Sequence, residues 1–189
     1  MKKELFSLPN LMGYFRILMI PVFLVLYYHA ETPADYTKAF VILAISMLTD
    51  LFDGRIARKF HMETELGKAL DPIADKLYQF AVALCLMIKF PLMLSVAAIL
   101  FFKEISMGIM GLVLINKGGQ VFGAKWYGKM CTFIIDVSMA FLLLLPMLDL
   151  HIPQSLINIL IYTCDVVLIF TSMMYTRLFA GKIKALDQD

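Results

Sequence analysis

The chain has 189 residues, of which 61% are hydrophobic, and its mean hydropathy is +0.80. These values are far from those of soluble proteins, so the sequence predicts an integral membrane protein that forms a single domain, residues 1–189. Because 15 acidic residues nearly balance 17 basic ones, a strongly basic nucleic-acid-binding protein is excluded.

An amphipathic lead, residues 1–10, precedes the first apolar segment, and we expect it to lie at the membrane interface and to end or turn at Pro9. A signal peptide is the alternative, but Arg16 interrupts the apolar stretch and no A-x-A cleavage site follows. The sequence predicts an all-α protein with six transmembrane helices. The predicted membrane segments are residues 11–28, 38–52, 71–88, 92–115, 128–147 and 154–179.

Orientation follows from the distribution of Lys and Arg, which accumulate on the cytosolic side of membrane proteins. With the N-terminus in the cytosol, fourteen basic residues lie at inner ends and loops, whereas the outer side has Lys38 and Lys89. We therefore expect both termini and the stretch 50–75 to face the cytosol. The inner residues are Lys2, Lys3, Arg16, Arg55, Arg58, Lys59, Lys68, Lys76, Lys117, Lys125, Lys129, Arg177, Lys182 and Lys184.

Four aspartates mark the candidate functional site. Asp50 and Asp53 are spaced i, i+3 and Asp71 and Asp75 are spaced i, i+4, so each pair lies on one face of its own helix. Four converging carboxylates repel one another unless cations lie between them. Oxygen ligands without a nearby His or Cys cluster favour Mg²⁺ or Mn²⁺, which often share their coordination with substrate phosphates.

The residues that follow Asp53 also suit phosphate binding. Gly54 and Ala57 leave space for a ligand near the backbone, and Arg55 and Arg58 carry guanidinium groups that match phosphate. A helix end with merely solvated charges is the alternative for any one of these residues.

The complete pattern D-x2-D-G-x2-A-R-x8-G-x3-D-x3-D resembles the signature of the CDP-alcohol phosphotransferase family. L-P-N at residues 8–10, followed by Arg16 and Pro21, and D-P-I-A-D-K at residues 71–76 are similar to the bacterial phosphatidylglycerophosphate synthases of that family. The signature positions are Asp50, Asp53, Gly54, Ala57, Arg58, Gly67, Asp71 and Asp75.

The resemblance implies an enzyme that transfers the phosphatidyl group of CDP-diacylglycerol to an alcohol and releases CMP. It implies two Mg²⁺ or Mn²⁺ ions on the four aspartates, with Asp75 also the candidate catalytic base. The family is usually homodimeric, which implies a homodimer here. The nucleotide-binding residues that the resemblance implies are Asn10, Gly54, Ala57, Arg58 and Gly67.

The resemblance further implies that basic residues in the second half of the chain bind the acceptor. Lys103, Lys125 and Lys129 are the candidates, and glycerol 3-phosphate is the expected acceptor. Phosphatidylglycerol, inositol phosphate and serine stay open as acceptors because the chain departs from the family pattern. Lys103 stands where the relatives have Arg, Gly111 where they have a second Arg, Cys131 where they have Lys, and Gly13 where they commonly have Thr.

Two acids lie inside apolar segments. Asp136 and Asp165 are functional candidates, because an ionised carboxylate is costly in a membrane; a helix-to-helix hydrogen bond or a neutral acid is the alternative. A cation transporter whose ion path contains Asp50, Asp53, Asp136 and Asp165 is the distant alternative to the enzyme, and CMP release from CDP-diacylglycerol separates the two. The single cysteines Cys85, Cys131 and Cys164 are expected to be small buried apolar residues.

Overall fold

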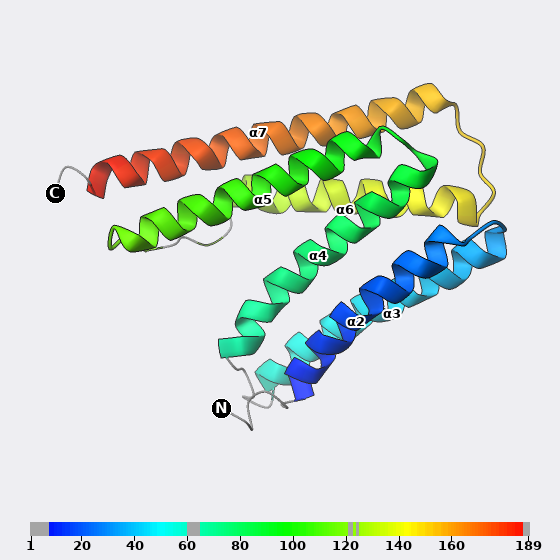
Figure 1. The fold of residues 1–189 in the computed structure, drawn as a ribbon, viewed down its shortest axis with the longest axis horizontal. Coiled ribbons are helices and arrows are strands. Elements are labelled where there is room, and N and C mark those ends of the chain that lie inside the picture. The colour runs from blue at the N-terminus through cyan, green and yellow to red at the C-terminus, as the bar shows by residue number, and fades with distance from the viewer. Residues whose placement is uncertain (1–7, 60–64, 121–122, 124, 187–189) are drawn as a thin grey trace. The chain divides into compact units, whose positions relative to one another are not determined.

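The computed structural model describes residues 8–59, 65–120, 123 and 125–186, without the side chains of residues 8–9, 50–59 and 65–72. These ranges form six α-helices and no β-strand, in agreement with the predicted all-α class (Figure 1). The helices are α2 (Leu8–Tyr28), α3 (Pro33–Lys59), α4 (Glu65–Lys89), α5 (Met93–Asn116), α6 (Trp126–Met147) and α7 (Gln154–Leu186).

Four helices in the described part of the chain are long and apolar enough to cross a membrane, namely α2, α5, α6 and α7. An apolar helix of about 20 residues spans the hydrocarbon layer, so the chain is an integral membrane protein. The predicted membrane crossings by α3 and α4 stay predictions.

Helix α2 begins earlier than the sequence predicts. Pro9 lies in its first turn instead of ending the preceding segment. Proline is tolerated there because the first helical N–H groups have no partner within the helix. Pro9 therefore does not separate residues 8–10 from the helix that follows; the interfacial position of the lead stays a prediction, and residues 1–7 lie outside the described ranges.

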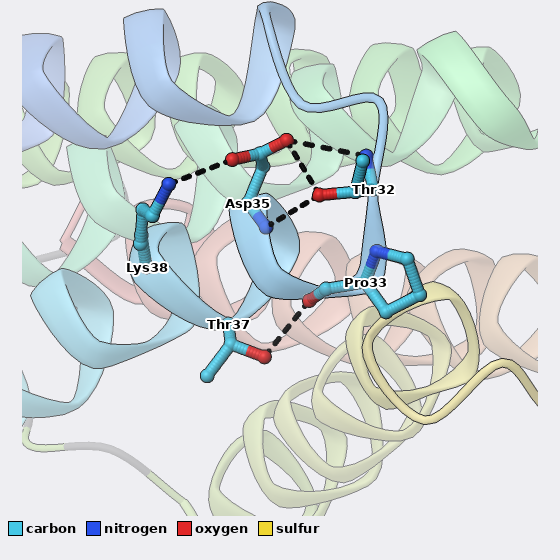
Figure 2. Close-up of polar contacts among 5 residues, drawn as sticks. All are labelled: Thr32, Pro33, Asp35, Thr37 and Lys38. Carbon is cyan, nitrogen blue, oxygen red and sulfur yellow. Dashed lines mark hydrogen bonds and ion pairs between the residues drawn. The ribbon is translucent and has the colours of Figure 1, made fainter.

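Helix α3 begins at Pro33, five residues before the predicted Lys38, because Thr32 and Asp35 cap it (Figure 2). The Thr32 backbone N–H donates to Asp35 Oδ2 at 3.2 Å, and the Asp35 backbone N–H donates to Thr32 Oγ1 at 3.3 Å. This reciprocal pair is a capping box with proline at the first helical position. Lys38 Nζ donates to Asp35 Oδ1 at 2.8 Å and, with Thr32, holds the pKa of Asp35 below its usual range.

Two other helices are longer than predicted. Helix α4 begins at Glu65, six residues before the predicted segment 71–88, so Gly67 lies in its first turn and Asp71 lies in its second turn. Helix α7 continues to Leu186, beyond the predicted end at Phe179. Both extensions contain Lys, Leu and Ala, which favour helix even where the apolar periodicity that guided the prediction is absent.

The chain divides into two compact units. The first contains Met1–Lys89 and Leu143–His151, and in it α2 packs against both α3 and α4. The second contains Phe90–Leu142 and Ile152–Asp189, and in it α5 packs against α7. That residues 1–189 act as one domain stays a prediction.

Aromatic contacts hold the helices of the first unit together. Phe23 of α2 is fully buried, and its ring lies 6.5 Å from that of Tyr78 in α4. Tyr27 of α2 meets Tyr36 of α3 edge to face, with ring centroids 5.3 Å apart. The Tyr78 hydroxyl donates to the Leu43 carbonyl of α3 at 2.9 Å. These contacts fix the three helices that carry the aspartates and Arg16.

Candidate active site

The structure places the two aspartate pairs on two helices, as predicted. Asp50 and Asp53 belong to the C-terminal part of α3, and Asp71 and Asp75 belong to the N-terminal half of α4. Only five residues separate the helices, and a stretch of that length spans at most roughly 20 Å. The two helix ends therefore lie at the same end of the first unit, where α2 also begins (Figure 1).

For most of the predicted metal and nucleotide ligands, the structure describes the helix backbone and not the side chain. The roles of their side chains stay predictions. Among the side chains that the structure does describe, no group of three or more His, Cys, Asp or Glu residues could hold a metal ion. The predicted ligands outside the described side chains are Asp50, Asp53, Gly54, Ala57, Arg58, Gly67 and Asp71.

Asp75, the predicted base, is described, and it forms an ion pair with Arg16. Arg16 Nη2 of α2 lies 2.5 Å from Asp75 Oδ1 of α4. The Arg16 side chain is 5% exposed, whereas that of Asp75 is 59% exposed. The Asp75 carboxylate is thus accessible to a substrate, while one of its oxygens is held by the buried guanidinium of Arg16.

The burial of Arg16 explains the pairing. A guanidinium inside an apolar helix must meet a charged or polar partner when it leaves water, because an isolated buried charge is strongly unfavourable. Sequence reasoning missed this pair because its members are 59 positions apart. The available signal was a lone arginine in an otherwise apolar membrane segment.

Two more polar side chains are buried in the helices of this end. Asn10, which the resemblance implies to bind the nucleotide, lies in the first turn of α2 and is almost fully buried. Gln79, which the sequence did not single out, follows Asp75 by one helical turn and is also buried. Buried amides are normally hydrogen-bonded, so both help to build a polar end on apolar helices.

The predicted acceptor-binding lysines belong to the second unit and have different surroundings. Lys103 lies within α5, is 7% exposed, and places Nζ 2.5 Å from Glu104 Oε1. Lys103 thus forms an ion pair with its neighbour in the sequence. Lys125 and Lys129 are exposed at the start of α6, where the Lys129 N–H donates to the Lys125 carbonyl at 3.1 Å.

Of the two acids in apolar segments, Asp165 forms the helix-to-helix contact that was the alternative to a functional role. Its Oδ2 lies 2.7 Å from Ser95 Oγ, which joins α7 to α5. Asp136 is exposed on α6. The three cysteines are free and buried, as predicted. His29 and His151 are exposed and lie between helices, and His61 lies outside the described residues.

Comparison with known proteins identifies the family. The family model described as CDP-alcohol phosphatidyltransferase matches residues 6–178, a range that includes every aspartate of the motif. Since it covers most of the chain, the match does not depend on the motif alone.

Named relatives agree with this match. A probable phosphatidylglycerophosphate synthase of Mycobacterium tuberculosis is 31% identical over 80% of this chain and 72% of its own length. The CDP-diacylglycerol–glycerol-3-phosphate 3-phosphatidyltransferase of Escherichia coli is 30% identical over 97% of this chain and 99% of its own. A cardiolipin synthase (CMP-forming) fusion protein of Schizosaccharomyces pombe is 34% identical over 56% of this chain and 17% of its own. The chain belongs to the CDP-alcohol phosphatidyltransferase family of phospholipid-synthesis enzymes.

Proposed function

We propose that the chain transfers the phosphatidyl group of CDP-diacylglycerol to glycerol 3-phosphate and releases CMP. The observation that carries the proposal is the similarity, over 97% of the chain, to relatives named for this reaction, together with the complete aspartate motif on α3 and α4. Family membership favours this enzyme over the cation transporter that was the distant alternative.

Asp50, Asp53, Asp71 and Asp75 are proposed to hold two Mg²⁺ or Mn²⁺ ions. The donor set fits such ions, because carboxylate oxygens are their preferred ligands and the four residues lie on two helix ends that the chain keeps close. Bound ions would polarise the phosphoryl oxygens and offset the negative charge that develops there. Arg16 adds a fixed positive charge beside the one aspartate that the structure describes in full.

In the proposed reaction, Asp75 accepts the proton of the acceptor hydroxyl. A bond forms between that oxygen and the phosphorus that carries the lipid, the bond from this phosphorus to CMP breaks, and CMP leaves with the electron pair. The exposure of Asp75 allows a hydroxyl to approach, and the ion pair through Oδ1 restrains the carboxylate. A well-placed base contributes about 10² to 10⁴ in rate.

The remaining site residues have proposed binding roles. Asn10, Gly54, Ala57, Arg58 and Gly67 are proposed to bind the CDP moiety. Lys125 and Lys129, exposed at the start of α6, are proposed to attract the phosphate of the acceptor. Lys103 is proposed to assist them, although the negative charge of Glu104 partly offsets its positive charge.

We also propose that all six helices cross the membrane, with both termini and the active site in the cytosol, and that the enzyme is a homodimer. The excess of Lys and Arg at the inner ends supports this orientation. Small residues on α5, such as Gly108 and Gly111, have open space around them, which suits close helix contact between subunits.

Phosphatidylglycerol is the second candidate acceptor. The match to a CMP-forming cardiolipin synthase over 56% of this chain favours it, and so does the pairing of Lys103 with Glu104, which lowers the net positive charge available for a phosphate. Inositol phosphate and serine remain candidates with no observation of their own.

The test is an acceptor panel. Purified protein in lipid is supplied with CDP-diacylglycerol, Mg²⁺ and, separately, glycerol 3-phosphate, phosphatidylglycerol, inositol phosphate or serine, and CMP release is measured. The proposal expects fastest release with glycerol 3-phosphate and a lipid product that carries its phosphate. Faster release with phosphatidylglycerol would support the second candidate.

A further inference from the structure

We propose that Tyr175 of α7 is a positioning residue for Lys125 and Lys129, which it holds in place for the phosphate of the acceptor. The inference rests on the proposed function, because it concerns how that function's acceptor site is built. Tyr175 belongs neither to the aspartate motif nor to the predicted acceptor-binding residues.

Tyr175 is anchored in the core of the second unit. Its side chain is 4% exposed and packs with Leu114 of α5 and Phe179, one turn further along α7. A tyrosine buried in apolar surroundings requires a partner for its hydroxyl group. It finds one at the segment that precedes α6.

That partner is the backbone of Lys125. The Lys125 N–H donates to Tyr175 Oη at 3.0 Å, across 50 positions of sequence. The N–H groups before and within the first turn of a helix have no partner inside the helix, so a side chain that supplies an acceptor there fixes where the helix begins. Tyr175 thus determines the place of α6's first turn relative to α7.

Gly128 leaves the space that this arrangement requires. A Cβ atom at residue 128 would collide with Tyr175 Oη and would lie 3.1 Å from Cε2 and Cζ of the same ring. Its backbone φ is ordinary, so the demand on this glycine is for space and not for an unusual conformation. Tyr127 adds an edge-to-face contact, with its ring centroid 4.9 Å from that of Tyr175.

The contact extends to both lysines through the backbone. The N–H groups of Gly128 and Lys129 donate to the Lys125 carbonyl, at 3.0 and 3.1 Å. Lys125 and Lys129 are therefore separated by one helical turn, and both are exposed. A dianionic phosphate is bound best by cations held at matched positions. A shift of this turn is therefore expected to weaken the binding of the acceptor more than that of the donor, CDP-diacylglycerol.

The experiment compares Tyr175→Phe, Gly128→Ala and the double variant in the CMP-release assay. Tyr175→Phe removes the hydroxyl and keeps the ring. We expect it to raise the KM for glycerol 3-phosphate about two- to tenfold, the effect of one ordinary hydrogen bond, and to leave the KM for CDP-diacylglycerol unchanged. Gly128→Ala is expected to have a larger effect in the same direction.

The double variant provides the sharpest readout. In the double variant, the alanine methyl group no longer collides with the tyrosine hydroxyl. The fold-increase in its KM for glycerol 3-phosphate should therefore be smaller than the product of the fold-increases of the two single variants. Tyr162→Phe and Gly181→Ala are matched controls, because Tyr162 is exposed on the same helix and a Cβ at Gly181 meets nothing within 4 Å. Both controls should behave like the wild type.

The outcomes separate this inference from the proposed function. If the wild type releases CMP with glycerol 3-phosphate but Tyr175→Phe leaves its KM unchanged, the positioning role is wrong and the function stands. Equal changes in both KM values, or a loss of thermal stability with no KM change, would also overturn the role, because they indicate general packing. If the wild type does not use glycerol 3-phosphate at all, the proposed function fails first.

Discussion

Arg16 and Asp75 join α2 to α4 through an ion pair of 2.5 Å at the end of the helices that carries the aspartates. The arginine is buried and the aspartate is exposed. This arrangement fits a carboxylate that acts on substrate while a second helix holds it in place.

Replacement of Arg16 tests whether the pair matters for activity. Arg16→Met should lower the turnover number for CMP release about tenfold, because it removes a charge-assisted hydrogen bond whose strength is reduced by the exposure of Asp75. Arg16→Lys should restore part of the activity. Lys38→Met is the control, since it breaks an exposed ion pair, with Asp35, at the start of α3; an equal loss in that variant would contradict the assignment.

The aspartate motif yields a second prediction. Asp50→Asn, Asp53→Asn and Asp71→Asn should each abolish CMP release, because an amide cannot supply the negative charge of a carboxylate ligand. CMP release is measured across a Mg²⁺ titration, with protein folding followed by thermal unfolding. Near wild-type turnover in any of the three at saturating Mg²⁺ would argue against a two-metal site.

The capping box of α3 provides a test of stability. Thr32→Ala should lower the free energy of unfolding by about 1 kcal/mol, the usual cost of a lost helix cap. Thr37→Ala is the matched control, because its hydroxyl donates only within α3, to the Pro33 carbonyl at 2.8 Å, among the contacts described (Figure 2). Thermal unfolding in detergent measures both variants, and equal stabilities would show that the cap is not needed.

The same cap should depend on pH. Lys38 and Thr32 lower the pKa of Asp35 in the folded protein, so its contribution to stability is complete above about pH 4, the ordinary carboxyl value. The contribution should be lost as the pH falls through the lower, folded-state pKa. Asp35→Asn should therefore show less loss of stability upon acidification than the wild type.

The contact between Ser95 and Asp165 predicts which substitutions α7 tolerates. Ser95 Oγ lies 2.7 Å from both Asp165 Oδ2 and the Leu92 carbonyl oxygen, and a hydroxyl has one proton to donate. Both contacts are hydrogen bonds when the Asp165 side chain is the donor to Ser95. Because an amide can also donate, Asp165→Asn should keep near wild-type stability.

The loss of unfolding free energy should be larger in variants that remove the contact between Ser95 and Asp165. Ser95→Ala and Asp165→Ala should each cost about 0.6 kcal/mol of unfolding free energy, and at most about 1.7 kcal/mol, as for other hydrogen bonds between membrane helices. Thr163→Ala serves as the control, because its hydroxyl donates to a carbonyl of its own helix. Greater destabilisation by Asp165→Asn than by Asp165→Ala would overturn the predicted donor role.

Topology can be tested by labelling single cysteines in a variant that lacks Cys85, Cys131 and Cys164. His61→Cys and Gly123→Cys should react with a membrane-impermeant reagent only from the cytosolic side, and Pro33→Cys only from outside, because the basic residues favour that orientation. Labelling of His61→Cys from outside would reverse the orientation.

Much of the fold could be predicted because apolar runs and turn signals locate most helices. The predicted ends of α5 lie within one residue of the observed ones, since Lys89, Phe90 and Pro91 interrupt the apolar run before it and Gly118 follows it. The start of α3 was placed too late because hydrophobicity does not report the capping pair of Thr32 and Asp35, although T-x-x-D is a readable signal.

The helices that carry the candidate site could be predicted from the sequence, whereas the contacts of their side chains could not. The spacing of the aspartates predicts two helices, and the structure has them there. The ion pair of Arg16 with Asp75 and the contact of Tyr175 with Lys125 join positions 59 and 50 residues apart. Local patterns cannot reveal such partners, and Tyr175 resembles any other aromatic residue of an apolar helix.

The most direct test of the account is the metal-dependent acceptor panel with the wild-type protein. With CDP-diacylglycerol and Mg²⁺, the account predicts that glycerol 3-phosphate gives the fastest release of CMP, with one phosphatidylglycerophosphate formed per CMP and no release after the metal is chelated. Absence of CMP release with every acceptor, or undiminished release after chelation, would contradict it.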